Sequence, residues 1–310
     1  MSPWKDKDRV LALIVGVILI TAIVLGAMAF FPLGPFSRER DWNFGSTVLI
    51  ESMDITIDAD VCDVDVSFGD LENKWVEVSM SVEGRSGYIS GSPDINFTVD
   101  HSLNGANLSV SIVLDMDTGP TVSYDESDIV VTIGRSVLLF LEIEVDVGDV
   151  VITVPENATL TGAAVHVDVG GLHVHLDEGA NVGGLELRSD VGSVNMDCAN
   201  ANFDEGSTVS AETGTGSIYL DVAQSSTPEG NVTFDCFAGV GSVRLTLTIE
   251  GDVAAEITSQ ANVGDIETDL SGFSGMDVHL LSDNHPDTWS IEFFLEADVG
   301  SVYIDAEWGE

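Results

Sequence analysis

Five side chains of the types that bind transition metals lie close together in the middle of the chain. They are His166, Asp168, His173, His175 and Asp177. Residues two apart along a β-strand share a face, so each of the two pairs could present its side chains to one ion across the corner at Gly170. The alternative is that the interleaved Val and Leu residues face the core and the His and Asp residues face solvent. The alternation favours this alternative, so we assign no metal or other cofactor from the sequence.

Aspartates at strand spacing offer the oxygen ligands that calcium prefers. They occur in two groups, Asp58, Asp60, Asp63 and Asp65, and Asp115 and Asp117. The sequence contains neither the EF-hand spacing nor a GGxGxD repeat. We therefore expect weak, nonspecific divalent cation binding by stacked carboxylates and no defined calcium site.

Catalytic motifs are not evident in the sequence. A glycan-cleaving enzyme would need a positioned acid and base, yet the repeated part carries only Arg188 and Arg244 beside its many acids, and no GxSxG, Cys/His pair or phosphate loop occurs. With so many carboxylates, close pairs arise by chance. The chain is predicted not to be an enzyme.

The charge balance excludes one class of partner. The chain has 53 acidic and 10 basic residues, a net charge of −43, and this field repels nucleic acid. The acids alternate with Val, Ile and Leu, as expected for the solvent face of strands, and they favour hydration in high salt, which suggests a halophilic archaeal source.

The three cysteines Cys62, Cys198 and Cys236 show no zinc spacing. We expect buried free thiols, with a Cys198–Cys236 bridge as the alternative.

The N-terminal segment predicts membrane attachment. Residues 10–31 carry no charge and would span about 33 Å as a helix, enough to cross a bilayer. The alternative is a cleaved signal peptide ending at Ala27-Met28-Ala29. We expect a short cytoplasmic tail (1–9), a single transmembrane anchor (10–31) in contact with lipid, a juxtamembrane linker (32–45) and an extracellular C-terminal part. Four sequons, at Asn96, Asn107, Asn157 and Asn231, are candidate N-glycosylation sites on that part.

A repeated step, Val-Gly-[Asp/Ser/Gly]-[Val/Leu/Ile], organises the C-terminal half. Its glycines are separated by 22, 22, 24, 25, 23 and 36 residues and are Gly148, Gly170, Gly192, Gly216, Gly241, Gly264 and Gly300. Each unit is predicted as strand, glycine corner, strand and turn, because a corner needs positive φ or close backbone approach. The fold class predicted is mainly β: the transmembrane helix, an aperiodic β-rich cap region (46–145) and a parallel β-solenoid of about six to seven rungs with a terminal cap (146–310). An antiparallel meander or sandwich is the alternative.

The segment VITVPENATL at residues 151–160, following a strand pair and hairpins and preceding Gly-Asp-Val type steps, carries a family resemblance. The chain resembles the adhesin-like domain family of bacteria and archaea, whose members are often membrane-tethered and have no defined biochemical role. The resemblance covers roughly residues 46–305 and implies a solenoid domain without catalytic residues. Cys62 in place of a glycine, Thr215 in place of a valine and the extreme acidity depart from the pattern.

These observations together predict a membrane-anchored, adhesin-like surface or binding scaffold. Its expected partners are the lipid bilayer and a surface protein or glycan. The alternatives are an extracytoplasmic sensor or regulatory domain of an envelope system, and a solenoid glycan-cleaving enzyme.

Overall fold

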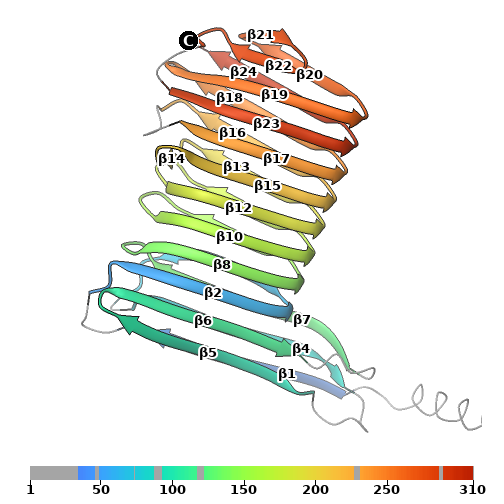
Figure 1. The fold of residues 1–310 in the computed structure, drawn as a ribbon. Helices are drawn as coiled ribbons and strands as arrows, with labels where there is room; N and C mark the ends of the chain where they lie inside the picture. The colour runs from blue at the N-terminus through green and yellow to red at the C-terminus, as the bar shows by residue number, and fades with distance from the viewer. Residues whose placement is uncertain are drawn as a thin grey trace, which may run out of the picture.

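The computed structural model describes residues 34–45, 49–72, 74–86, 93–116, 122–226, 231–285 and 289–309, and in these ranges the chain is mainly β (Figure 1). The predicted tail and anchor, residues 1–31, lie outside the described residues. Among those that are described, no helix has the length and apolar character needed to cross a membrane.

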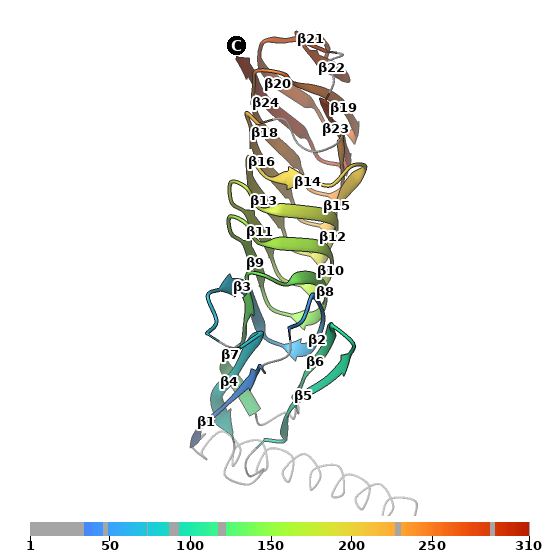
Figure 2. The same ribbon diagram turned by 90° about the vertical axis from the view of Figure 1, so that its left-hand side faces the viewer.

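The strands form two large sheets that face each other across a common core; Figure 2 shows sheet A on the left and sheet B on the right. Sheet A has eleven strands in the spatial order β1 (Gly34–Phe44), β4 (Val76–Ser86), β7 (Val122–Gly134), β3 (Asp63–Gly69), β9 (Val150–Val154), β11 (Leu172–Leu176), β13 (Val194–Ala199), β16 (Ile218–Gln224), β18 (Val243–Glu250), β24 (Val302–Gly309) and β20 (Ile266–Ser271). Sheet B has thirteen strands: β21 (Phe273–Met276), β22 (His279–Ser282), β19 (Val253–Val263), β23 (Trp289–Val299), β17 (Val232–Val240), β15 (Ser207–Thr215), β12 (Asn181–Val191), β10 (Thr159–Val169), β8 (Leu138–Val147), β2 (Ser52–Val61), β6 (Asn107–Met116) and β5 (Ile95–Asn104), with β14 (Asn202–Phe203) beside β12.

The period-two alternation of the sequence determines which side chains enter the core. In β11, Leu172, Val174 and Leu176 are buried while the two histidines between them point outward. Each fully buried aliphatic side chain stabilises the fold by about 1.5–3 kcal/mol. Phe203, Phe234 and Phe293 add an aromatic column, with ring centroids 5.8 and 4.9 Å apart in the two successive pairs.

The predicted parallel β-solenoid is wrong, because the strands belong to two mixed sheets. The middle strands pair in parallel, but β1–β4, β4–β7, β5–β6, β19–β22 and β21–β22 pair antiparallel. Strand order also departs from chain order: β2 lies between β6 and β8, and β23 lies between β17 and β19. A sequence period reports repeated strand–corner–strand units, but it does not specify how strands distant in sequence pair. Strands of residues 46–145 join the same two sheets as the later ones.

A glycine corner joins each of seven sheet B strands to the sheet A strand that follows. The corner glycines have φ between 150° (Gly148) and 158° (Gly216), a conformation that side chains rarely adopt. A Cβ at Gly216 would lie 1.6 Å from the carbonyl oxygen of Gly192, and one at Gly241 would lie 1.4 Å from that of Gly216. The corners therefore stack through backbone contacts that only glycine permits.

The residue after each corner glycine explains the Asp and Ser preference of the repeated step. At the equivalent position after Cys62, Asp63 Oδ1 accepts a hydrogen bond from the Asp149 N–H at 2.8 Å. Asp149 Oδ1 accepts one from the Gly171 N–H at 2.6 Å. Ser217 Oγ accepts from the Ser242 N–H at 3.4 Å. A short polar side chain at this position thus satisfies a backbone donor of the neighbouring corner.

The valine that precedes six of the seven corner glycines lies on the surface, and Thr215 takes its place before Gly216. Val169 pairs in register with Val147 and Val191, and these side chains are 47%, 42% and 50% exposed. β-branched side chains at matching positions of adjacent strands pack against one another. The valine of the repeated step therefore forms a ladder along the corner edge of sheet B.

Substitution of Gly216 by Ala is expected to destabilise the fold by at least about 3 kcal/mol, because the new Cβ combines backbone strain with overpacking against the Gly192 carbonyl. Gly206→Ala is the matched control, since Gly206 has φ +76° and nothing within 4 Å of its Cβ position. The control should lose only about 1–2 kcal/mol. Urea unfolding measures both values. Equal losses would contradict the stacking explanation.

Candidate functional site

The five predicted metal-ligating residues are divided between the two sheets. His166 and Asp168 lie on β10 of sheet B, whereas His173 and His175 lie on β11 of sheet A, with Asp177 directly after it. The corner at Gly170 carries the chain from one sheet to the other, so outward side chains before and after it occupy opposite faces. The structure therefore gives two separate clusters.

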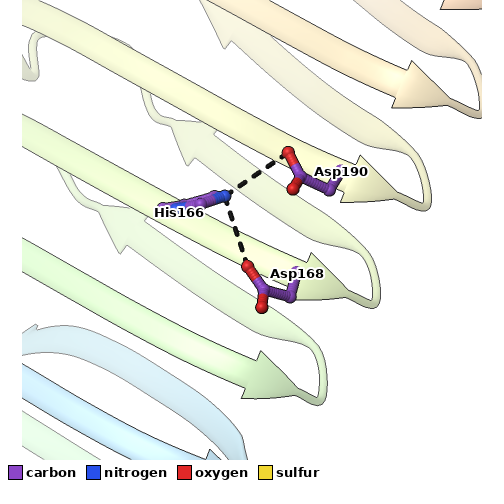
Figure 3. Close-up of side chains that lie close together, drawn as sticks. All are labelled: His166, Asp168 and Asp190. Carbon is purple, nitrogen blue, oxygen red and sulfur yellow. Dashed lines mark ion pairs between the residues drawn. The ribbon is translucent and has the colours of Figure 1, made fainter.

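The sheet B cluster consists of His166, Asp168 and Asp190 (Figure 3). His166 Nε2 lies 3.4 Å from Asp168 Oδ1 and 3.5 Å from Asp190 Oδ1. This nitrogen is hidden from solvent and has no hydrogen-bond partner. Asp190 was not among the residues predicted. The 22-residue spacing was the signal that could have found it, since Asp190 precedes Gly192 as Asp168 precedes Gly170.

Arg188 supports Asp190 from the neighbouring side. Its Nε donates to Asp190 Oδ1 at 3.0 Å, and its Nη1 donates to Glu212 Oε1 at 3.3 Å. The hydrogen bond from Arg188 lowers the pKa of Asp190, and the same bond raises the pKa of Arg188. Asp190 is therefore an ionised carboxylate held in one position.

Asp60, Asp146, Asp168 and Asp190 form a row on adjacent strands of sheet B, which we call the aspartate row. The paired residues on either side of these positions establish the alignment, since Val145 pairs with Val167 and Val147 pairs with Val169 on β8 and β10. Burial raises the pKa of Asp146, and the charges of Asp168, Asp60 and Asp58 raise it further. The row is thus a site of mutual repulsion between carboxylates.

The sheet A cluster places two imidazoles around one carboxylate. His173 Nε2 lies 2.8 Å from Asp197 Oδ2, and His175 Nε2 lies 2.9 Å from Asp177 Oδ1. His175 Nδ1 is 3.7 Å from the same Asp197 oxygen. Both histidines therefore already have a carboxylate partner at hydrogen-bond distance.

A row of two tyrosines and an arginine crosses the outer face of sheet A beside this cluster. Tyr219 pairs in register with Arg244, and Arg244 pairs with Tyr303. The Arg244 guanidinium carbon lies 5.2 Å from the Tyr303 ring centroid, within cation–π range. Sequence reasoning missed this row because its members are separated by 25 and 59 residues and only strand pairing aligns them.

Two neighbouring depressions run along the tyrosine–arginine row. One has a volume of about 310 Å³ and is lined by Arg244, Tyr303, Glu267, Asp269 and Asp305 among others. The other has a volume of about 340 Å³ and is lined by His173, Asn195, Asp197, Tyr219, Asp221 and Arg244 among others. Arg244 and Thr246 line both. The result is a continuous open surface that combines aromatic rings with hydrogen-bonding groups.

The calcium candidates do not face one another as one set. Asp58 and Asp60 lie on β2 of sheet B, whereas Asp63 and Asp65 lie on β3 of sheet A. Asp60 Oδ2 accepts a hydrogen bond from the Met116 N–H at 2.8 Å. Asp117 lies outside the described residues.

The three cysteines are buried free thiols, as predicted. Burial raises the pKa of Cys62 and of Cys198 to about 12, and it raises that of Cys236 as well. Thiols in this state are poor nucleophiles and poor metal ligands. They contribute to the core and not to a reactive site.

The four sequon asparagines occupy different surroundings. Asn96, Asn157 and Asn231 are exposed, whereas Asn107 is half-buried and donates to Asp54 Oδ2 at 2.8 Å. Asn157 lies in a turn with φ 64°. Their use as glycosylation sites remains a prediction.

Comparison with known proteins gives only distant structural similarity. No family model matches the chain, and no curated protein matches it significantly. Among solved structures, a candidate cell adhesion protein from Clostridium sporogenes ATCC 15579 has 14% identity and a TM-score of 0.39, with 88% of this chain and 100% of that chain covered. A candidate adhesin from Bacteroides fragilis NCTC 9343 has 15% identity and a TM-score of 0.34, covering 87% and 97%. A candidate lipid binding protein from Parabacteroides distasonis ATCC 8503 has 11% identity and a TM-score of 0.29, covering 89% and 96%. At these values the similarities carry no conclusion about the ligand or activity of this chain.

Replacing Asp146 by Asn is expected to raise the melting temperature at neutral pH and low salt. The pKa of Asp146 is higher in the folded state than in the unfolded state. The stabilisation that Asp146 contributes is therefore fully present at pH values below its unfolded-state pKa, and it is lost as the pH rises through its folded-state pKa. The gain should shrink between 0.1 and 1 M salt, where the screening length falls from about 10 to about 3 Å. Thermal unfolding across a salt series measures it.

Asp235→Asn is the matched control, since Asp235 is exposed on sheet B and its register partners, Ser210 and Phe294, are uncharged. This control should show no comparable gain at low salt. A D146N gain that does not depend on salt would contradict the repulsion in the aspartate row.

Proposed function

We propose that the chain is a membrane-anchored binding scaffold without catalytic activity, and that the outer face of sheet A binds a glycan. The observation that carries the proposal is the tyrosine–arginine row, Tyr219–Arg244–Tyr303, set among carboxylates in two adjoining depressions. The face lies on consecutive strands of a rigid sheet, which suits display of a preformed surface.

The chemistry of this face matches that of a sugar chain. Tyrosine offers an apolar ring against which the C–H face of a sugar can pack, together with a hydroxyl for hydrogen bonding. Asp221 and Asp305 supply acceptors for sugar hydroxyls, and Arg244 supplies donors. A surface that combines aromatic rings with many hydrogen-bonding groups suits a hydrated, hydroxyl-rich ligand better than an apolar one.

The geometry favours an extended ligand. Tyr219 and Tyr303 lie two strands apart, a separation of roughly 9–10 Å at the usual strand spacing. A chain lying across the strands could contact both rings and continue over further strands. The net charge of −43 repels polyanions, so the glycan class proposed is neutral or cationic.

The open shape supports a binding role and not a catalytic one. A carboxyl group that acts as a general acid in glycoside cleavage is kept protonated by an apolar, water-excluding pocket. The acids of this face instead lie on a sheet surface beside shallow depressions. The scaffold is therefore proposed to hold its ligand unchanged.

Tyr219→Ala combined with Tyr303→Ala is expected to weaken binding to the best ligand of a neutral and cationic polysaccharide panel by at least tenfold, or about 1.4 kcal/mol. Biolayer interferometry with the full-length chain measures the affinity. Phe140→Ala with Phe294→Ala is the matched control, because these aromatic side chains are 47% and 44% exposed on sheet B.

The control pair should bind as tightly as the unmodified chain. Equal losses in both double variants, or no binding to any member of the panel, would overturn the glycan proposal. Release of shortened sugars from the panel would overturn the non-catalytic part alone.

Membrane attachment by residues 10–31 has its own test. The full-length chain should sediment with membranes and resist carbonate extraction, since 22 uncharged residues suffice to span the bilayer. A chain starting at residue 32 with a substitute secretion signal should be released. Release of the full-length chain by carbonate would contradict an uncleaved anchor.

A further inference from the structure

We propose that His166, Asp168 and Asp190 bind a divalent transition-metal ion of the zinc type on the outer face of sheet B. The three side chains come from two adjacent parallel strands, and their ligand atoms all lie within 4.8 Å of one another (Figure 3). This site lies on the sheet opposite the proposed glycan face and does not depend on it.

The distances fit a shared metal better than direct hydrogen bonds. His166 Nε2 lies 3.4 and 3.5 Å from the two carboxylate oxygens, beyond the usual range of about 2.7–3.2 Å for N–H···O bonds. Ligands bound tetrahedrally at about 2.0–2.2 Å are themselves about 3.3–3.6 Å apart. The observed separations are those of two edges of such a tetrahedron.

His166 Nε2 lacks a hydrogen bond of normal length. The atom is hidden from solvent and lies at ion-pair distance from two carboxylate oxygens, although the rest of the side chain is partly exposed. A metal ion between the three groups would satisfy the imidazole nitrogen and neutralise part of the carboxylate charge.

The ligand set selects the kind of ion. One imidazole nitrogen with two carboxylate oxygens suits zinc and its neighbours, whereas calcium and magnesium take oxygen ligands in larger number. Three protein ligands leave a fourth tetrahedral position for water or for a group from a partner.

The surroundings orient the ligands and compensate their charges. Arg188 donates to Asp190 Oδ1 and to Glu212, which fixes the Asp190 carboxylate while the second lone pair of Oδ1 remains for the metal. The positive charge of Arg188 is thereby shared between two acids. The remaining members of the aspartate row, Asp60 and Asp146, add negative potential that attracts a cation.

The test is a titration of the full-length chain with Zn²⁺ in excess Mg²⁺, which occupies nonspecific carboxylates. We expect one tight site per chain, and at least a tenfold weaker affinity in His166→Gln and in Asp168→Asn. His175→Gln is the matched control, because His175 sits on the opposite sheet with Asp177 as its partner. It should bind Zn²⁺ as the unmodified chain does.

Co²⁺ substitution provides a second readout that does not depend on affinity. A tetrahedral site gives intense visible absorption, which should be present in the unmodified chain and in H175Q and lost in H166Q. Circular dichroism confirms that the variants fold. Equal Zn²⁺ affinity in the unmodified chain and H166Q, or equal loss in H175Q, would overturn the proposal.

Discussion

The structure depends on the contact between each corner glycine and a carbonyl oxygen of the adjoining corner. That oxygen belongs to a glycine at every corner except Gly148, where it belongs to Cys62. At these corners a Cβ would lie within 1.4–1.9 Å of a backbone oxygen, so no other residue fits without a backbone shift. The same corners are joined by hydrogen bonds, such as that from the Gly170 N–H to the Val191 carbonyl at 3.0 Å. Close stacking fixes the register of both sheets simultaneously, because each corner ends one strand and begins the next.

That register places side chains of neighbouring strands side by side on two outer faces. On sheet B it aligns the aspartate row and brings Asp190 beside His166 and Asp168. On sheet A it aligns Tyr219 with Arg244 and Tyr303. Any function of the outer faces is therefore built from residues at equivalent positions around the corners, with chemistry set by what each strand carries there.

The sequence allowed prediction of the β composition, the corner glycines and the inward set of β11, because these depend on local alternation and on one conformational requirement. It did not allow prediction of the two mixed sheets. Strand β23 lies between β17 and β19, and β2 lies between β6 and β8. These positions depend on pairing between distant segments, which a local sequence period does not specify.

Only part of the sheet B cluster was predicted, because the sequence shows which residues share a strand but not which strands lie side by side. His166 and Asp168 were found together because they are two apart on one strand, but His173 and His175 were assigned to the same cluster although the Gly170 corner moves them to the other sheet. Asp190 was recoverable from the 22-residue spacing. The tyrosine–arginine row could not be found from the spacing. Tyr303 lies beside Arg244 because the last strand, β24, pairs with β18 out of chain order.

Native-state hydrogen exchange at the corner amides tests the central claim most directly. If stacked corners hold the two sheets together, the amides of Gly170, Gly192, Gly216 and Gly241 should exchange slowly, with one common free energy close to that of global unfolding. Exchange at these four amides as fast as at the exposed hairpin turn of Gly105 would contradict it.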